Sequence, residues 1–527
     1  MVDPVGTSLA VFATVDLCVK YGKQLLGKYQ SFKDADRDIR ELVLCVENHW
    51  IKFEYQIRFL RGVWNNLDER LQVHQHHLLH TLQIKLQEAN NTIGSAIGTQ
   101  IQSSTAESVF KKSGSIHKGK YALYLKDCIK RSVDDLQKWH DMFDPSWFLI
   151  NRVSSPNIDD QLSDEFVKDN ESVLILKELR EAVRASQSYS VSVGEGSIWL
   201  APDFIMAQRE RVLFSDVQVA RAQNGSQSIL VDTVILDAQA QLAATTKDIR
   251  DLARILSKSD PKCFGLLRCA GVIKQVQPLD QIESAKFELL FTVPDGLRAP
   301  TSLRTVLRMS EDIYSLNERI CLARSLASSV MYIHSSKFVH KNIRPETTIL
   351  FTNDESQLAA AFLLGFQKFR PITGWTFRRG DSLWERDLYR HPSRQGLQPE
   401  EDYMMQHDIY SLGVLLLEIG LWTSFIEQDS SGRSIPGPVL HIGGILNEPR
   451  ERKKAAAIKS TLVELASAKL ASKMGHKYSS TVLACLTCLD KTNNDFGDED
   501  EFLDEDGIVV GVRYIEKVLL RIHEISV

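Results

Sequence analysis

Apolar residues recur at steps of three and four over a long, uninterrupted stretch near the beginning of the chain. They form one stripe that consists of Ile39, Leu42, Val43, Val46, Trp50, Phe53, Ile57, Leu60 and Trp64. This spacing matches the period of the α-helix and predicts one long helix with an apolar face. A face of that length needs other helices to cover it, which limits the first part of the chain to a bundle or a coiled coil.

The rest of the first 150 residues repeats the helical period. Asp3 is placed to cap a helix that begins at Pro4. The apolar residues of that helix include Leu9, Phe12, Val15 and Val19, a further stripe is Leu71, Leu78, Leu82, Leu86, Ala89 and Ile93, and the last is Tyr121, Leu125, Ile129, Val133, Leu136, Trp139 and Phe143. The polar stretch 94–119 between the last two stripes indicates a mobile connection. Amphipathic helices without strands predict an up-and-down bundle over residues 1–150.

The periodicity changes beyond a polar, turn-prone segment at residues 154–164. A helix at about 171–185 follows, so residues 151–190 are predicted to be a linker with a connecting helix. Strand-like runs then begin, and Asn224-Gly225 gives a strong hairpin signal between the first two. The predicted strands span residues 212–220, 228–236, 264–276 and 287–293, a helix at 247–257 lies among them, and helices dominate from Thr301 onward. This order predicts a two-lobed α+β domain over residues 191–527.

The composition is that of a soluble globular chain and excludes several classes of function. With 63 Lys and Arg against 68 Asp and Glu, the net charge of −5 lacks the basic excess of a dedicated nucleic-acid-binding protein. No apolar run reaches the ~20 residues that a membrane-spanning helix needs, and the first residues lack the positive charge of a secretory signal. The eight cysteines are scattered, which favours reduced thiols. We therefore expect a cytoplasmic protein that binds no nucleic acid.

Two motifs in the second half of the chain are more specific than any other pattern in it. Residues 332–350 read YIHSSKFVHKNIRPETTIL, and residues 407–418 read HDIYSLGVLLLE. The first resembles the catalytic loop of eukaryotic protein kinases, His-Arg-Asp-Leu-Lys-Pro-Glu-Asn-Ile-Leu, and the second resembles the kinase helix that opens with a buried Asp. The resemblance covers roughly residues 195–525 and implies a small lobe at about 195–295 and a large lobe at about 300–525.

Several residues match positions that shape the kinase fold. The resemblance implies structural rather than catalytic roles for His340, Pro345, Asp408 and Gly413. In that family the Asp of the second motif braces the catalytic loop by accepting hydrogen bonds from its backbone. Here that residue is Asp408.

The groups that transfer phosphate in a kinase are missing at the matching positions. The reaction depends on cations around the phosphates, on metal ions and on a base near the acceptor hydroxyl. The catalytic Asp falls on Asn342, the metal-binding Asn on Thr347, the Asp of Asp-Phe-Gly on Gly365 or, shifted by one, on Leu364, and the phosphate-holding Lys on about Val234. No Lys lies between Lys177 and Lys247, and that interval has no Gly-rich loop. The resemblance therefore implies a pseudokinase without catalytic residues, metal or cofactor, in which ATP binding is not expected.

The N-terminal helices show a second resemblance, carried by pattern more than by a sharp motif. The Asp-Pro opening, the helix through Asp16-Leu17-Cys18-Val19-Lys20-Tyr21 and the segment Glu47-Asn48-His49-Trp50 resemble the HeLo and HeLo-like domains of fungal incompatibility and programmed-death proteins. In that family the apolar first helix can leave the bundle and insert into membrane. A helix buried in its own bundle has the same apolar character and is commoner. Asp16 also opposes insertion, since a carboxylate in hydrocarbon costs roughly 2.5–3.5 kcal/mol.

Three other groups of residues have partial features of metal sites. Four histidines crowd one predicted helix, but no carboxylate or cysteine nearby completes a ligand set. Cys485 and Cys488 have a metal-like spacing without a second pair, and the acidic run 495–506 lacks the order of a calcium-binding loop. The histidines are His74, His76, His77 and His80. No metal site is predicted from these groups.

The sequence thus predicts a signalling protein in which a catalytically inactive kinase-like domain restrains or presents a helical effector. Its expected partners are proteins, including further copies of the chain through the bundle, and a membrane surface on activation. An atypical active kinase, with an acid such as Glu355 replacing the missing groups, is one alternative. A non-enzymatic scaffold that only binds other proteins is the other.

Overall fold

The computed structural model divides the chain into two compact units, residues 1–177 and residues 178–527. The division falls inside the segment 151–190 that the sequence predicts to be a linker with a connecting helix. The structure describes residues 4–30, 37–105, 127, 129–136, 139, 143, 146–153, 155–162, 171–187, 198–206, 208–223, 227–236, 242–279, 282–309, 314–353, 357–371, 383–493, 495–496 and 508–525.

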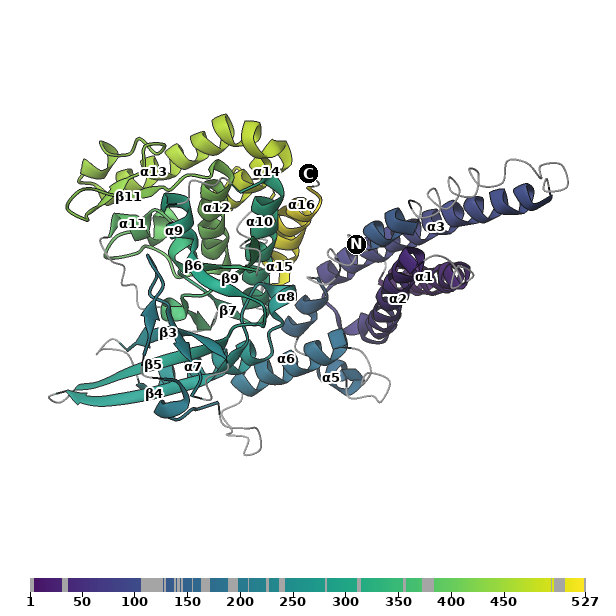
Figure 1. Cartoon of the computed structure of the whole chain (residues 1–527), viewed down its shortest axis with the longest axis horizontal. Helices are drawn as coiled ribbons and strands as arrows, with labels where there is room; N and C mark the ends of the chain where they lie inside the picture. The colour runs from purple at the N-terminus through teal and green to yellow at the C-terminus, as the bar shows by residue number, and fades with distance from the viewer. Residues whose placement is uncertain are drawn as a thin grey trace. The chain divides into compact units, whose positions relative to one another are not determined.

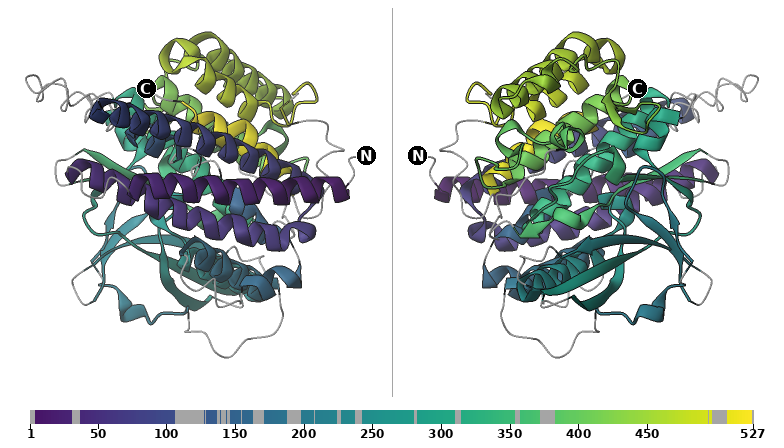
Figure 2. Two further views of the ribbon diagram at one scale, coloured as in Figure 1. Left: turned by 90° about the vertical axis from the view of Figure 1, so that its right-hand side faces the viewer. Right: turned by 90° about the vertical axis from the view of Figure 1, so that its left-hand side faces the viewer.

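The first unit is helical, and its described residues contain no strand. Three long helices dominate it: α1 (Pro4–Gln30), α2 (Arg37–Val63) and α3 (Glu69–Thr105). α1 packs against both α2 and α3, and Figure 2 shows these purple and indigo helices running side by side. The shorter elements are η1 (Trp64–Asn66), η3 (Leu149–Arg152) and α5 (Pro156–Leu162), and the helix α6 (Glu171–Gln187) contains the division between the two units.

The apolar stripe of α2 becomes its buried face. Val43, Val46, Trp50, Phe53, Ile57 and Leu60 are at most 3% exposed. The ring of Trp50 lies over Gly22 of α1, where an added Cβ would come within 2.2 Å of ring atoms. Phe53 meets Trp139 edge to face with centroids 4.6 Å apart, and the indole N–H of Trp139 donates to the carbonyl of Leu78 at 3.0 Å. Large aromatic side chains therefore supply much of the core of this unit.

The connection predicted at residues 94–119 begins later than expected, because α3 continues through Gly94 to Thr105. Residues 106–126 lie outside the described part of the chain. Beyond them, Ile129, Leu136, Trp139 and Phe143 of the last predicted stripe are buried, as a packed helix face requires.

The second unit opens with a five-stranded antiparallel sheet in the order β1-β2-β3-β5-β4. The helix α7 (Leu242–Ser257) packs against β4 and β5. The strands are β1 (Glu210–Arg211), β2 (Gln218–Arg221), β3 (Ser228–Ile235), β4 (Cys269–Leu279) and β5 (Ile282–Thr292). An apolar cluster that includes Ile229 and Val231 of β3 covers one face of the sheet, which leaves the residues that alternate with them on the other face.

The pairing of β2 with β3, with Arg221 opposite Ser228, confirms the predicted hairpin, and residues 224–226 lie outside the described part. The strand predicted at 212–220 is wrong in its first half. Residues 212–217 form a turn in which Phe214 has a φ of 54°, which no extended strand allows. The strand predicted at 264–276 begins only at Cys269, because the short helix α8 (Pro261–Phe264) occupies its start.

Helices dominate the rest of the second unit, as the sequence predicts. Figure 1 shows α10, α12 and α14 grouped on one side of the five-stranded sheet, and every residue of α12 is buried. The helices are η5 (Pro202–Phe204), α9 (Leu303–Met309), α10 (Leu316–Ser335), η6 (Pro345–Thr347), η7 (Phe366–Lys368), α11 (Trp384–Asp387), η8 (Pro392–Arg394), α12 (Met405–Leu421), η9 (Ile445–Asn447), α13 (Glu451–Leu465), η10 (Ala466–Leu470), α14 (Ala471–Leu486), α15 (Ile508–Tyr514), η12 (Ile515–Leu519) and α16 (Leu520–His523).

Three small sheets accompany these helices. One has three strands in the order β6-β8-β9, and the other two are the antiparallel pairs β10-β7 and β11-β12. The strands are β6 (Arg298–Ser302), β7 (Phe338–Val339), β8 (Thr348–Thr352), β9 (Leu358–Leu363), β10 (Arg370–Pro371), β11 (Ile426–Gln428) and β12 (Ser434–Pro436). The described chain is therefore a helical unit followed by an α+β unit.

Candidate functional site

The loop between β7 and β8 carries the catalytic-loop resemblance, and Asp408 holds it in place. The carboxylate of Asp408, in the first turn of α12, accepts the backbone N–H groups of His340 (2.7 Å) and Lys341 (2.9 Å). It also accepts the hydroxyl of Tyr403 (2.6 Å) and contacts Nε2 of His334 (3.0 Å). Burial alone would raise the pKa of Asp408, but the bonds from His334 and the other donors lower it to about 2. These are the backbone hydrogen bonds that the kinase resemblance implies for this residue.

The other three fold-shaping residues are also buried inside the second unit. His340 is neutral, since burial lowers its pKa to about 4, and its ring packs on Phe366 with centroids 4.9 Å apart. Pro345 opens η6 at a position where its missing N–H is tolerated. Gly413 allows α12 to approach α14 closely, because an added Cβ would lie 2.7 Å from the Cβ of Cys485.

Asn342 and Thr347, which the kinase resemblance aligns with the catalytic Asp and the metal-binding Asn, are engaged in hydrogen bonds. Nδ2 of Asn342 donates to the carbonyl of Gly365 (3.1 Å) and to Oε1 of Gln367 (3.0 Å). Nε of Arg344 donates to Oδ1 of Asn342 at 3.0 Å. The hydroxyl of Thr347 bonds the carbonyls of Asn342 (2.8 Å) and Arg344 (2.9 Å). Both residues therefore serve the internal structure of the loop.

A buried carboxylate joins this loop to the five-stranded sheet. Asp232 lies in the middle of β3 and is 0% exposed. One of its oxygens accepts the backbone N–H groups of Gly365 (2.9 Å) and Phe366 (2.6 Å), and the other faces Nε2 of Gln367 at 3.4 Å. Because Gln367 is also bonded to Asn342, a continuous network runs from β3 through residues 365–367 to the catalytic-like loop.

Sequence reasoning missed Asp232. It placed the missing Lys at about Val234, which lies two residues further along β3 and therefore on the same face of the strand. In the structure Val234 is a buried apolar residue, whereas the side chain of Asp232 reaches residues 365–367. The signal that could have found it was a charged residue inside the apolar run Ile229-Leu-Val-Asp-Thr-Val234.

Gly365 has no room for a side chain. Its φ of 88° lies in the left-handed region, which favours glycine. An added Cβ would stand 2.2 Å from Cγ2 and 2.7 Å from Cβ of Thr347. The carboxylate that the kinase pattern requires at this position is therefore excluded by backbone conformation and by the packing of Thr347.

The electrostatics of the network are those of a desolvated acid. Burial raises the pKa of Asp232 to about 6, the N–H groups of Phe366 and Gly365 oppose that rise, and the charge of Asp216 adds to it. None of these groups is a cation. At neutral pH Asp232 is therefore a buried negative charge at one end of the network, and Arg344 is bonded to Asn342 at the other end.

We expect Asp232→Asn to stabilise the protein at neutral pH. The folded pKa of about 6 lies above the ordinary value of 3.8, so the carboxylate disfavours folding increasingly as pH rises between those values. An amide of the same shape keeps an oxygen for Gly365 and Phe366 but carries no charge. Urea unfolding at pH 7.5 should show a gain of about 1–3 kcal/mol that shrinks toward pH 4. A loss of stability at both pH values would contradict this account.

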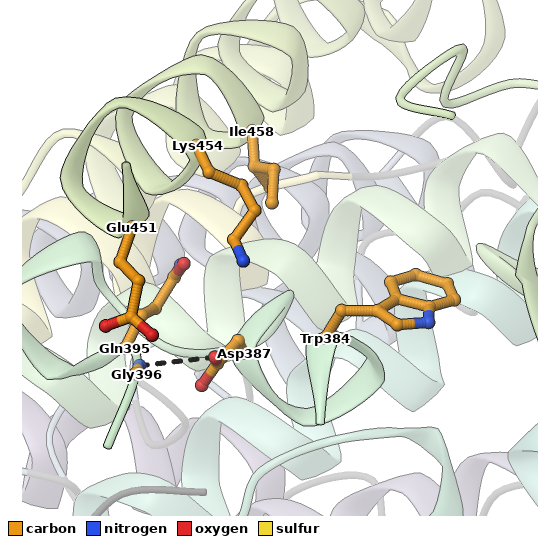
Figure 3. Close-up of a pocket in the computed structure, with 7 residues that line it drawn as sticks. All are labelled: Trp384, Asp387, Gln395, Gly396, Glu451, Lys454 and Ile458. Atoms are coloured by element: carbon orange, nitrogen blue, oxygen red, sulfur yellow. Dashed lines mark hydrogen bonds between the residues drawn. The ribbon is translucent and has the colours of Figure 1, made fainter. Parts of the chain in front are cut away.

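A small hollow lies elsewhere in the second unit, between α11 and α13. Figure 3 shows Trp384 and Asp387 of α11 and Lys454 and Ile458 of α13 around it, with Gly396 donating to the carboxylate of Asp387. Its volume of about 30 Å³ is room for roughly one water molecule. None of its lining residues belongs to the network around Asp232.

No described part of the chain groups three or more metal-ligating side chains. His76 and His77 stack with ring centroids 6.4 Å apart on α3, and burial together with its two histidine neighbours lowers the pKa of His76. Of the acidic run, Asp495 pairs with Arg521 at 2.8 Å, and residues 497–506 lie outside the described part.

The apolar residues of α1 are used mainly within its own unit. Val15 is buried, Phe12 and Val19 are half-buried, and the side chain of Leu9 lies outside the described part. The guanidinium of Arg61 stands over the ring of Phe12 at 5.3 Å and pairs with Asp16 at 2.6 Å. Within the described ranges, no helix has both the length and the apolar character needed to cross a membrane.

Comparison with known proteins supports a kinase-like domain in this chain. Over 139 residues the chain is 31% identical to a serine/threonine-protein kinase-like protein of Arabidopsis thaliana. The match takes in 25% of this chain and 37% of that protein, so it spans just over a third of the relative's length. No family model matches the chain. The resemblance of residues 1–150 to HeLo domains stays a prediction.

Proposed function

We propose that the second unit is a two-lobed kinase-like domain that does not transfer phosphate and acts as a regulatory module for the helical first unit. The observation that carries this proposal is the buried carboxylate of Asp232, hydrogen-bonded to Gly365 and Phe366. On the kinase resemblance, β3 supplies the cation that holds the phosphates, and residues 365–367 supply the metal ligand. In this chain β3 instead supplies the carboxylate of Asp232, which meets the backbone N–H groups of Gly365 and Phe366.

The expected loss in the rate of phosphoryl transfer is large, which favours an inactive kinase-like domain. Removal of one group that stabilises charge in an active site commonly lowers the rate by about 10²–10³. Here Asp232 reverses the charge, Asn342 cannot accept a proton as a carboxylate does, and Gly365 cannot carry a metal-binding acid. Such losses need not add, but each affects a different requirement of phosphoryl transfer.

Nucleotide binding tests the proposal directly. We expect ATP to leave the thermal unfolding of the full chain unchanged, with and without Mg²⁺, and we expect no transfer of labelled phosphate to protein substrates.

Gly365→Asp should lower stability without restoring transfer, because a Cβ there meets Thr347. Labelled phosphate transfer that is lost in Asn342→Ala would favour the alternative of an atypical active kinase. The acid suggested for that alternative, Glu355, lies outside the described residues.

The first unit is proposed to be the effector, with proteins, including other copies of the chain, as its partners. The HeLo resemblance extends this to a membrane-perturbing role in an incompatibility or cell-death response. Because Val15 and other apolar residues of α1 are buried, insertion into a membrane would first require α1 to leave its packing against α2 and α3. Dye release from anionic vesicles by the full chain would support the membrane role. Stable protein complexes without dye release would favour the scaffold alternative.

A further inference from the structure

The turn between β1 and β2 is bonded to the helical part of the second unit. We call residues 212–217 the strap. The carbonyl of Leu213 accepts two hydroxyl hydrogen bonds, from Ser302 (2.6 Å) and from Thr305 (2.9 Å). Ser302 also accepts the backbone N–H of Thr305 at 3.1 Å, so the two hydroxyls are fixed at the start of α9. The backbone carbonyl of Leu213, in the turn between β1 and β2, is thus bonded by the side chains of Ser302 and Thr305 at the start of α9.

An aromatic contact adds to these bonds. The guanidinium of Arg308, in the last turn of α9, stands over the ring of Phe214 at 4.4 Å, within the range of a cation–π interaction. Arg308 is itself oriented by Glu427 (3.1 Å) and Gln428 (3.2 Å) of β11. Two adjacent residues of the strap, Leu213 and Phe214, are therefore held by the helical part of the unit. Their partners there are Ser302, Thr305 and Arg308.

The strap is strained. Phe214 has a φ of 54° although it is not glycine, and a bulky residue in the left-handed region loses about 1–2 kcal/mol. Internal bonds hold this shape: Ser215 N–H to the Val212 carbonyl (3.0 Å), and Arg211 Nε to the Ser215 carbonyl (2.7 Å). At the same place Leu213 exposes 53% of its surface. Val212, Ser215 and Val217 of the strap are buried. Its strained tip at Leu213 and Phe214 is therefore held by these internal bonds and by the contacts with α9.

We infer that the tip of the strap is a latch between the five-stranded sheet and α9, and that it releases without unfolding of the unit. The hydrogen bonds to the carbonyl of Leu213 and the contact of the Phe214 ring with Arg308 stabilise the closed form. The strained backbone conformation of Phe214 destabilises it. The role of the latch as a regulator rests on the proposed function, in which the second unit regulates the first. Release would separate the tip of the strap from α9 while Asp232 still joins the sheet to residues 365–367, which gives a regulatory module two states.

Hydrogen exchange of the full chain, measured without nucleotide, tests the latch. If the strap releases locally, its backbone-bonded amides, those of Val212 and Ser215, exchange at least tenfold faster than those of the central strand β3. Thr305→Val removes one hydrogen bond to Leu213 and should speed strap exchange about fivefold. The matched control is Thr352→Val, which removes a hydroxyl bond to the carbonyl of Arg298 outside the strap, and it should leave strap exchange unchanged.

A second pair of variants separates strain from the loss of the ring. Phe214→Ala and Phe214→Gly both remove the contact with Arg308, but only glycine relaxes the backbone at a φ of 54°. We expect strap protection factors to be at least threefold higher in the glycine variant than in the alanine variant. Strap amides that exchange only as slowly as β3, and that do not respond to Thr305→Val, would overturn the inference. Binding of ATP would overturn the proposed function but leave this result intact.

Discussion

Replacing Arg304 with methionine is expected to lower the free energy of unfolding of the second unit by about 3–5 kcal/mol. The side chain of Arg304 is 2% exposed and lies between the carboxylates of Glu346 (2.8 Å) and Glu418. It also donates to Ser424 (2.9 Å) and to the hydroxyl of Tyr389 (2.5 Å). Burial raises the pKa of Glu418 in spite of the Arg304 charge beside it. Methionine fills the volume but leaves that acid buried without its cation.

Urea unfolding at pH 7 measures this loss. Lys477→Met is the matched control, because Lys477 pairs with Glu524 at 3.0 Å while both side chains are more than half exposed; it should change stability by less than about 1 kcal/mol. Adding Glu418→Gln to Arg304→Met should recover part of the loss, since no buried charge is then left alone. A change below about 1 kcal/mol in Arg304→Met would show that this ion pair contributes little.

Asp408→Asn is expected to destabilise the second unit by about 3 kcal/mol at pH 7. Each oxygen of Asp408 receives two contacts, Oδ1 from Lys341 and Tyr403 and Oδ2 from His340 and His334. An asparagine presents N–H groups on one side, so one pair of donors faces another donor. The folded pKa of about 2 lies below the ordinary 3.8, so the contribution of the carboxylate is complete above pH 4 and is lost as pH falls through 2.

The effect should be concentrated in the loop that Asp408 holds. Hydrogen exchange at residues 338–347 should accelerate in Asp408→Asn more than exchange in the five-stranded sheet. Asp429→Asn provides the control, since Asp429 accepts backbone N–H groups from Ser431 (2.8 Å) and Arg433 (2.9 Å) in an exposed turn. It should leave the loop unchanged. Uniform acceleration across the second unit would mean that Asp408 stabilises the fold as a whole rather than the loop.

The parts of the structure that sequence predicts well are those fixed by local periodicity. Most of the first stripe lies on the buried face of α2, Trp64 is buried in η1, and β2 pairs with β3 as the Asn224-Gly225 signal predicts. The strand predicted at 212–220 fails, because residues 212–217 take their shape from bonds to Ser302 and Thr305, which are distant in sequence. Local pattern carries no information about such partners.

The candidate site likewise contains one residue that a sequence motif identifies and one that only tertiary contacts identify. Asp408 could be assigned from its motif, since its hydrogen-bond partners belong to a second motif at fixed spacing. Asp232 could be noticed as a charged residue inside an apolar run, but its role could not be assigned. Residues two apart on a strand share a face, and only the tertiary contact with Gly365 and Phe366 shows which one points at the loop. The alternation of residues along a strand therefore locates a functional position only to within two residues on the same face.

The lack of space at Gly365 couples this position to Thr347. The Cβ of an aspartate placed there would stand 2.2 Å from Cγ2 of Thr347, on a backbone that only glycine adopts without strain. Thr347 would have to become smaller first, and that change also removes the hydroxyl that joins the carbonyls of Asn342 and Arg344. We therefore expect an acid at residue 365 to be accommodated only when several positions change together.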